Sequence, residues 1–129
     1  MQQQKKVVIV MENDPQVLKG LILLLEDMQF NVTPANFQHE LANLTVNQAA
    51  CPVLLVLPFE LDNKTSGIEL VKCLRTDFKH HIPAILLSHE NGFSPDRFVD
   101  EDIVVLSDRI SPKDLRRNIS SLLSNTLAV

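Results

Sequence analysis

Histidine and cysteine are the first candidates for metal binding or nucleophilic chemistry, and the sequence has four histidines and two cysteines. The histidines are His39, His80, His81 and His89. No two of them have the i, i+4 spacing that places metal ligands on one face of a helix, and Cys51 and Cys73 form no C-x-x-C pair. We therefore expect no metal site and no disulfide, and we interpret His80 and His81 as exposed loop residues.

Sequence motifs of catalysis are also missing. The sequence has no nucleophile elbow and no Ser-His-Asp pattern, and its glycines, Gly20, Gly67 and Gly92, form no phosphate-binding loop. We therefore expect neither an enzyme nor a bound cofactor. His89 is the histidine of most functional interest, because it follows Ser88 at the end of a predicted strand and an unperturbed imidazole titrates near neutral pH.

The composition is that of a globular protein with a modest negative charge. With 129 residues, of which 45% are hydrophobic, the chain can bury one core, and we expect one domain spanning residues 1–129. The net charge of -4 gives no electrostatic reason to expect nucleic acid as a partner. Lys113, Arg116 and Arg117 gather on one segment, where their helical spacing favours the solvated face of a helix.

The start of the sequence, MQQQKK, leads into a short apolar run at residues 7–11. That run is too short for the core of a signal peptide and far too short to cross a bilayer. The absence of a cysteine framework favours a reducing compartment. We therefore expect a cytoplasmic protein that does not contact a membrane.

Five short apolar runs have the length of β-strands. They cover residues 7–11, 30–33, 53–57, 84–87 and 103–106. The runs VVIVM, VLLVL and AILL are continuous rather than alternating, as is typical of strands that helices cover on both faces. The pattern therefore favours a parallel sheet at the centre of the fold.

The segments between these runs contain helix signals of unequal strength. Three segments begin with residues that can cap a helix, and these caps are Asn13 or Asp14, Ser66 and Ser111. Pro15 and Pro112 strengthen the first and the last of them, because proline suits the first helical position. We expect these helices to end near Gln29, near Phe78 and close to the C-terminus. A weaker helix is predicted after Asn36.

The stretch between the fourth and fifth strands is the least regular, because residues 88–102 are rich in Asn, Gly, Ser, Pro and Asp. Only residues 95–99 have helical character, and we expect one or two turns there. The order of elements is typical of an α/β doubly wound fold with a five-stranded parallel sheet, here with a short or irregular fourth helix. In such folds a site lies at the carboxyl ends of the strands, near the point where the strand order reverses.

Four segments together resemble the receiver domain of response regulators, the CheY-like family. The run VVIVMENDPQVLKGLILLLEDMQFNV is similar to that family's first strand, acidic cluster, first helix and second strand. SGIELVKCLR resembles its third helix, IPAILLSHE its fourth strand, and LSDRISPKDL its fifth strand and last helix. The resemblance covers essentially the whole chain and implies a flavodoxin-like (βα)5 fold and a role in signalling.

In that family the strand ends hold an acidic pair that binds Mg²⁺, an Asp that accepts a phosphoryl group from a histidine kinase, a Ser or Thr, and a Lys followed by a cis-Pro. The resemblance places Glu12 and Asn13 at the acidic pair, so a neutral amide replaces one carboxylate. Asp14 follows, and we interpret it as the cap of the first helix rather than as a metal ligand.

The resemblance places Pro58 at the phosphoacceptor position, and a shift of one residue would place Phe59 there. Neither side chain can form an acyl phosphate. The loop that follows is one residue longer than in the family, which leaves Glu60 or Asp62 as a displaced acceptor. Nothing in the sequence places the oxygens of either residue in the pocket.

Ser88 matches the hydroxyl position, whereas Asp108 and Arg109 stand where the family has its Lys and Pro. A pair of unit charges about 4 Å apart near a protein surface is worth roughly 4 kcal/mol at an effective dielectric constant of 20, so an anion in place of the cation opposes a phosphoryl group. Val105 replaces the aromatic switch residue. Without the Pro we expect a trans peptide and a reshaped loop before Ile110. The degenerate phosphorylation pocket therefore consists of Glu12, Asn13, Pro58, Ser88 and Asp108.

These exchanges predict a non-catalytic pseudo-receiver, a signalling or regulatory module of a two-component-like or transcriptional pathway. It would act by binding a protein partner or a second copy of itself, the latter through the last helix or the strand and short segment beside it. One alternative is a phosphorylatable receiver with an atypical acceptor such as Asp62. Another is a small-molecule sensor in which the vacated pocket near Pro58, Ser88 and Asp108 binds a cationic or neutral ligand.

Overall fold

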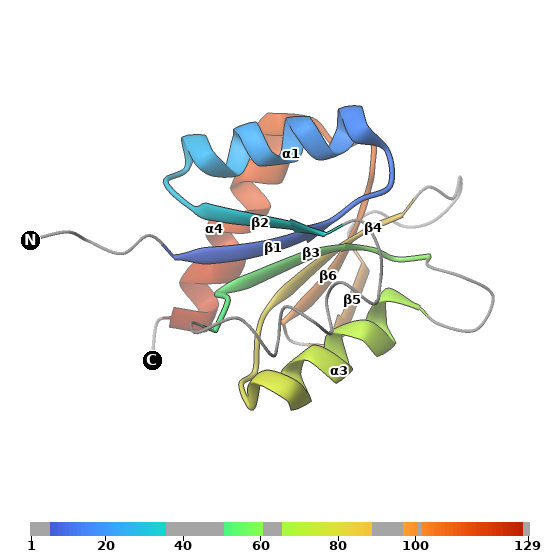
Figure 1. Ribbon diagram of the computed structural model, residues 1–129, viewed down its shortest axis with the longest axis vertical. Coiled ribbons are helices and arrows are strands. Elements are labelled where there is room, and N and C mark those ends of the chain that lie inside the picture. Colours follow the sequence, from blue (N-terminus) through green and yellow to red (C-terminus); the bar gives the residue numbers. More distant parts are fainter. Residues whose placement is uncertain (1–5, 36–50, 61–65, 89–96, 101, 128–129) are drawn as a thin grey trace, which may run out of the picture.

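A computed structural model of the chain has one β-sheet with helices on both of its faces (Figure 1). It describes residues 6–35, 51–60, 66–88, 97–100 and 102–127. The strands are β1 (Val7–Met11), β2 (Asn31–Ala35), β3 (Leu54–Pro58), β4 (Ala84–Ser88), β5 (Arg97–Asp100) and β6 (Ile103–Ser107). The helices are α1 (Pro15–Asp27), α3 (Gly67–Phe78) and α4 (Pro112–Leu127).

The strand order in the sheet is β2-β1-β3-β4-β6-β5, and every neighbouring pair is parallel except β5 with β6. The five strands expected from the sequence are therefore present and parallel, and the doubly wound fold is confirmed. The chain places β2 on one side of β1 and β3 on the other, so the strand order reverses between β1 and β3. The carboxyl ends of the five parallel strands lie at one edge of the sheet.

The segment before β6 differs from the prediction. Instead of a helical turn within residues 95–99, residues 97–100 form the edge strand β5, which pairs antiparallel with β6 and has a register shift between Phe98 and Asp100. A helix of one turn leaves most of its backbone N–H and C=O groups without partners, whereas residues 97–100 bond β6 along the antiparallel ladder. Phe98 and Val99 also favour strands. The weak helix predicted after Asn36 lies outside the described residues.

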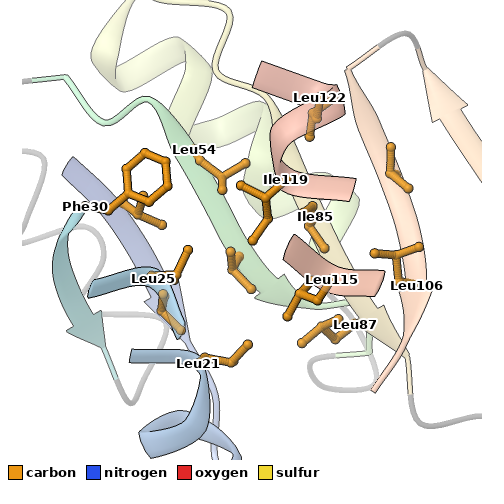
Figure 2. Close-up of a cluster of buried hydrophobic side chains, with 14 residues drawn as sticks. Leu21, Leu25, Phe30, Leu54, Ile85, Leu87, Leu106, Leu115, Ile119 and Leu122 are labelled. Carbon is orange, nitrogen blue, oxygen red and sulfur yellow. The ribbon is translucent and has the colours of Figure 1, made fainter. Parts of the chain in front are cut away.

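The core has two parts, one on each face of the sheet. On one face the side chains of α1 and α4 cover the sheet, and Figure 2 shows Leu21 and Leu25 of α1 together with Leu115 and Ile119 of α4 over the strands. On the other face, α3 packs through Leu70, Val71 and Leu74 on a second buried cluster. Since both faces are covered, all five residues of β3 and of β4 are buried, which explains their continuous apolar sequences.

The predicted caps begin the three described helices. The Asp14 carboxylate accepts a hydrogen bond from Gln16 N at 2.9 Å. The Ser66 hydroxyl accepts one from Glu69 N at 3.3 Å, and α3 ends at Phe78 as expected. At the start of α4 the hydroxyl of Ser111 accepts one from Asp114 N at 3.1 Å. Each side chain bonds a backbone N–H that has no partner within the helix.

Basic residues of α4 lie on its solvated face, as the spacing predicted. Lys113, Arg116 and Arg117 are all exposed. Arg116 also reaches Asp27 at the end of α1, with 2.5 Å between nitrogen and oxygen, and so connects the two helices of this face. Because both side chains are well exposed, this ion pair contributes little to stability.

Two glycines give a direct test of the packing. A Cβ on Gly67 would lie 2.2 Å from the carbonyl oxygen of Pro58 and 3.1 Å from a methyl group of Leu86, whereas a Cβ on Gly20 of α1 would meet nothing within 4 Å. We expect Gly67→Ala to lower the free energy of unfolding by roughly 1–3 kcal/mol because the β3–α3 connection must shift. Gly20→Ala should raise it by about 0.5–1 kcal/mol, because alanine favours the helix.

Urea denaturation followed by circular dichroism measures both changes. If Gly67→Ala is as stable as the parent protein, the close approach of Pro58 to the start of α3 is wrong.

Candidate functional site

The residues singled out by the resemblance lie at the carboxyl edge of the sheet, after or at the ends of four parallel strands. Glu12 follows β1, Pro58 ends β3, Ser88 ends β4 and Asp108 follows β6. Asn13 lies beside Glu12 and is exposed. This is the edge at which doubly wound folds bind ligands, so the location suits a site even though the residue types differ from those of the family.

Glu12 is buried, with only 3% of its surface exposed. Its Oε1 accepts hydrogen bonds from the backbone nitrogens of Asn13 at 3.0 Å and Asp14 at 3.2 Å. The carboxylate therefore bonds its own chain at the turn into α1. Asp14 accepts from Gln16 N as the helix cap, which agrees with the interpretation of Asp14 from the sequence.

Pro58 and Phe59, the two possible acceptor positions, are both integrated into the fold. Pro58 is buried at the end of β3, where it pairs with Leu87 of β4. The Phe59 nitrogen donates to Leu87 O, the Phe59 carbonyl accepts from Gly67 N, both at 2.8 Å, and its side chain packs on the α3 side of the sheet. In neither register does a carboxylate stand at the end of β3.

The carboxylate of Glu60 lies in the pocket, which the sequence did not predict. Its Oε2 accepts a hydrogen bond of 2.7 Å from the hydroxyl of Ser88, a residue that is only 2% exposed. The Glu60 backbone forms an isolated antiparallel bridge with Ser66, which fixes the residue just before α3. The sequence named Glu60 as a displaced acceptor, but the position of its oxygens depends on the path of the chain after β3. Asp62, the other displaced acceptor considered, lies outside the described residues.

Asp108 is bonded to the same serine from the other side. Its backbone nitrogen donates to the carbonyl oxygen of Ser88 at 3.0 Å, and its side chain is partly exposed. Beyond it, the nitrogens of Arg109 and Ile110 both donate to Ser107, at 3.1 Å each, so the loop closes on the end of β6. No peptide bond among the described residues is cis. Ser88 is therefore bonded to the segments after both β3 and β6.

Val105, at the position of the family's aromatic switch residue, is fully buried in the cluster beneath α3. A side chain confined to the core at this position cannot alternate between an inward and an outward rotamer without leaving a cavity. Val105 therefore stabilises the packing of β6 and does not act as a residue that switches between two rotamers.

The resemblance implies Mg²⁺ at this edge, and the residues present do not fit it. Mg²⁺ requires several oxygen ligands in near-octahedral geometry. Here the Oε1 of Glu12 bonds two backbone N–H groups and the Oε2 of Glu60 bonds the Ser88 hydroxyl. Asn13 offers an exposed amide, and Pro58 offers no side-chain ligand. Within the described ranges, no three His, Cys, Asp or Glu residues gather as a metal-binding group.

Among the described residues, the histidines and cysteines add no nucleophile to this edge. His80 and His81 are exposed, as predicted, but His81 Nε2 lies 2.7 Å from Asp102 Oδ2, a contact that the sequence did not indicate. Cys51 and Cys73 are free and exposed. Burial of part of the Cys51 side chain raises the pKa of its thiol, which lowers the thiolate fraction at neutral pH. His39 and His89 lie outside the described residues. None of the described helices is long and apolar enough to span a membrane.

A double-mutant cycle tests the contact between Ser88 and Glu60. We expect Ser88→Ala to lower the free energy of unfolding by roughly 1.5–3 kcal/mol, because it removes a buried hydrogen bond to a carboxylate. In the double variant Ser88→Ala with Glu60→Gln, the loss in free energy of unfolding should be about 1 kcal/mol smaller than the sum of the losses in the two single variants. Ser107→Ala is the matched control: Ser107 lies opposite Ser88 in the sheet, but its hydroxyl bonds Arg109 N, so its loss and that of Glu60→Gln should add. Additive losses for Ser88 and Glu60 in urea denaturation would mean that the two side chains do not interact.

The comparisons find structural similarity without sequence similarity. No family model and no curated protein matches the sequence. A response regulator receiver protein from Sinorhizobium medicae superposes with a TM-score of 0.77 at 16% identity, covering 94% of this chain and 96% of the other.

Two further solved structures agree. The N-terminal domain of a response regulator/sensory box/GGDEF 3-domain protein from Carboxydothermus hydrogenoformans has a TM-score of 0.73 at 17% identity, covering 95% of this chain and 98% of the other. The PhyR response regulator REC domain from Erythrobacter litoralis has a TM-score of 0.72 at 18% identity, covering 92% and 90%. The chain therefore has the fold of the CheY-like receiver domains.

Proposed function

We propose that this chain is a non-catalytic, receiver-like signalling module that acts by binding a protein partner. The observation that carries the proposal is the hydrogen bond from the buried Ser88 hydroxyl to the Glu60 carboxylate at 2.7 Å. A group of the chain itself already bonds the hydroxyl that the resemblance assigns to a phosphoryl group. With Pro58 at the acceptor position, the pocket has its polar contacts without a modification.

The charges at the edge of the sheet support the same proposal. A phosphoryl group entering there would meet the carboxylate of Glu60 beside Ser88, and an anionic residue, Asp108, stands at the position of the family's cation. Each anion within about 4 Å opposes an incoming negative charge by roughly 4 kcal/mol at an effective dielectric constant of 20. Phosphoryl transfer requires a site that positions the phosphoryl group and stabilises its negative charge. The anionic residues at this edge disfavour both requirements.

A signalling module that catalyses no reaction must act by binding other molecules at its surface. One of the structurally similar chains is named as the N-terminal domain of a three-domain protein, which supports a modular role for this fold. The partner is either another protein or a second copy of this chain. We expect a second copy to bind at the last helix, or at the strand and short segment beside it. Light scattering distinguishes these two partners. The mass of a dimer would identify a second copy of the chain as the partner, and the mass of a monomer would mean that the partner is a different protein.

Glu60 also supports a second candidate function, an atypical phosphoacceptor. A Glu60 oxygen would attack the phosphorus of a phosphodonor, form an acyl phosphate and release the donor's leaving group. Its distance of 2.7 Å from the Ser88 hydroxyl is the observation in favour. The protein is therefore incubated with acetyl phosphate and Mg²⁺ and its intact mass recorded, with Glu60→Gln beside Glu69→Gln, an exposed glutamate of α3, as the control.

We expect no gain of a phosphoryl mass and no cooperative thermal stabilisation by Mg²⁺ with beryllofluoride at millimolar concentrations. The reason is the joint loss of the acceptor at Pro58, of one acidic ligand at Asn13 and of the cation at Asp108. A mass gain that Glu60→Gln abolishes and Glu69→Gln retains would overturn the proposed function in favour of the second candidate.

A further inference from the structure

A cavity of about 230 Å³ opens between α1 and the start of α4, on the face of the sheet opposite α3. Leu21 and Leu24 of α1, Leu87 at the end of β4 and Leu115 of α4 line it. In Figure 2 the labelled side chains of Leu21, Leu87 and Leu115 lie at the same end of the core cluster. The cavity is therefore a gap in the packing between the two helices, close to the carboxyl edge of the sheet.

Gly20 is an exposed residue that contributes to the lining of this cavity. It lies in the middle of α1, where glycine costs about 0.5–1 kcal/mol relative to alanine, and a Cβ there would meet no atom within 4 Å. No packing contact in the described structure explains the glycine. Beside it, Leu23 has 60% of its surface exposed and is the large apolar side chain most open to solvent among the described residues. Apolar surface is thus available inside the cavity and, at Leu23, elsewhere on α1.

Asp108 gives the cavity its charge. Of the residues that line it, Asp108 is the one with an ionisable side chain, and the remaining lining is apolar or glycine. A carboxylate can accept several hydrogen bonds at once, and in partly apolar surroundings it attracts a cation more strongly than in bulk water. A ligand that fits both features has an apolar body and a positive group at one end.

We propose that this cavity binds a small arylalkylamine, with a single aromatic ring between α1 and α4 and the ammonium group at Asp108. The volume of the cavity limits the size of the ligand. An apolar cavity of about 150 Å³ binds one benzene molecule, so 230 Å³ leaves room for a short amine-bearing chain beside one ring. The negative charge of Asp108 determines the chemical class of the ligand, because a carboxylate favours a cation over an anion of the same shape. The site is separate from the Ser88–Glu60 contact, although the backbone of Asp108 bonds Ser88.

Three probes of the same size test the proposal on the intact chain. Phenethylamine, 2-phenylethanol and phenylacetate share a benzyl group and differ in the charge of the polar group at the other end. Each is titrated at low salt while the amide chemical shifts of the protein are recorded by NMR. We expect phenethylamine to bind with a dissociation constant in the millimolar range, about five-fold tighter than the alcohol, with phenylacetate weakest. The shifts should centre on Gly20, Leu24 and Asp108.

Variants connect the binding to the cavity. Gly20→Leu should fill the space and abolish binding of phenethylamine, whereas Gln16→Leu, which adds the same side chain at an exposed position of α1 outside the lining, should leave it unchanged. Asp108→Asn should remove the preference for the amine over the alcohol. Equal binding of the three probes, binding that survives Gly20→Leu, or no binding of phenethylamine up to its solubility limit would each overturn the proposal. Saturation by a partner protein that Gly20→Leu abolishes, with no response to the amine, would assign the cavity to that partner instead.

Discussion

Ser88 ends a strand in the middle of the sheet with its hydroxyl and its carbonyl bonded in opposite directions. The hydroxyl donates to Glu60, which follows β3, and the carbonyl accepts from the nitrogen of Asp108, which follows β6. Because Ser88 is almost completely buried, water does not compete for these bonds, and their loss would leave polar groups unsatisfied. The three segments at the carboxyl edge are thereby held as one unit, and the properties of the site depend on it.

The sheet explains why these polar groups gather at its edge. Each residue of β3 and β4 is buried under helices, so a polar side chain along either strand would need a partner inside an apolar core. At the strand ends the chain turns away from the sheet, and backbone N–H groups become available to carboxylates. Glu12 uses two of them and Asp14 uses one. Backbone donors therefore stabilise the carboxylates of Glu12 and Asp14 at this edge.

The sequence predicted the parts of the structure that depend on local chemistry. The caps at Asp14, Ser66 and Ser111 satisfy helix donors within three residues, and the apolar runs reflect burial on both faces, so each was readable from a short window. Strand β5 was not, because its pairing with β6 outweighs a weak local preference. Glu60 was considered as a displaced acceptor, but its contact with Ser88 was not predicted, for a related reason. Its contact with Ser88 spans 28 positions in the sequence and depends on the path of the chain after β3.

A contact made by the chain itself also limits how this domain can be regulated. A ligand shifts a conformational equilibrium only by the difference between its affinities for the two states. A phosphoryl group supplies that difference when it is added and removed, but Glu60 is part of the chain, and its bond to Ser88 is present in every molecule that has this structure. On the proposed function, the free energy for any change of state must therefore come from a bound partner or ligand. The residue best placed to transmit it is Asp108, which lines the cavity between α1 and α4 and bonds Ser88 through its backbone.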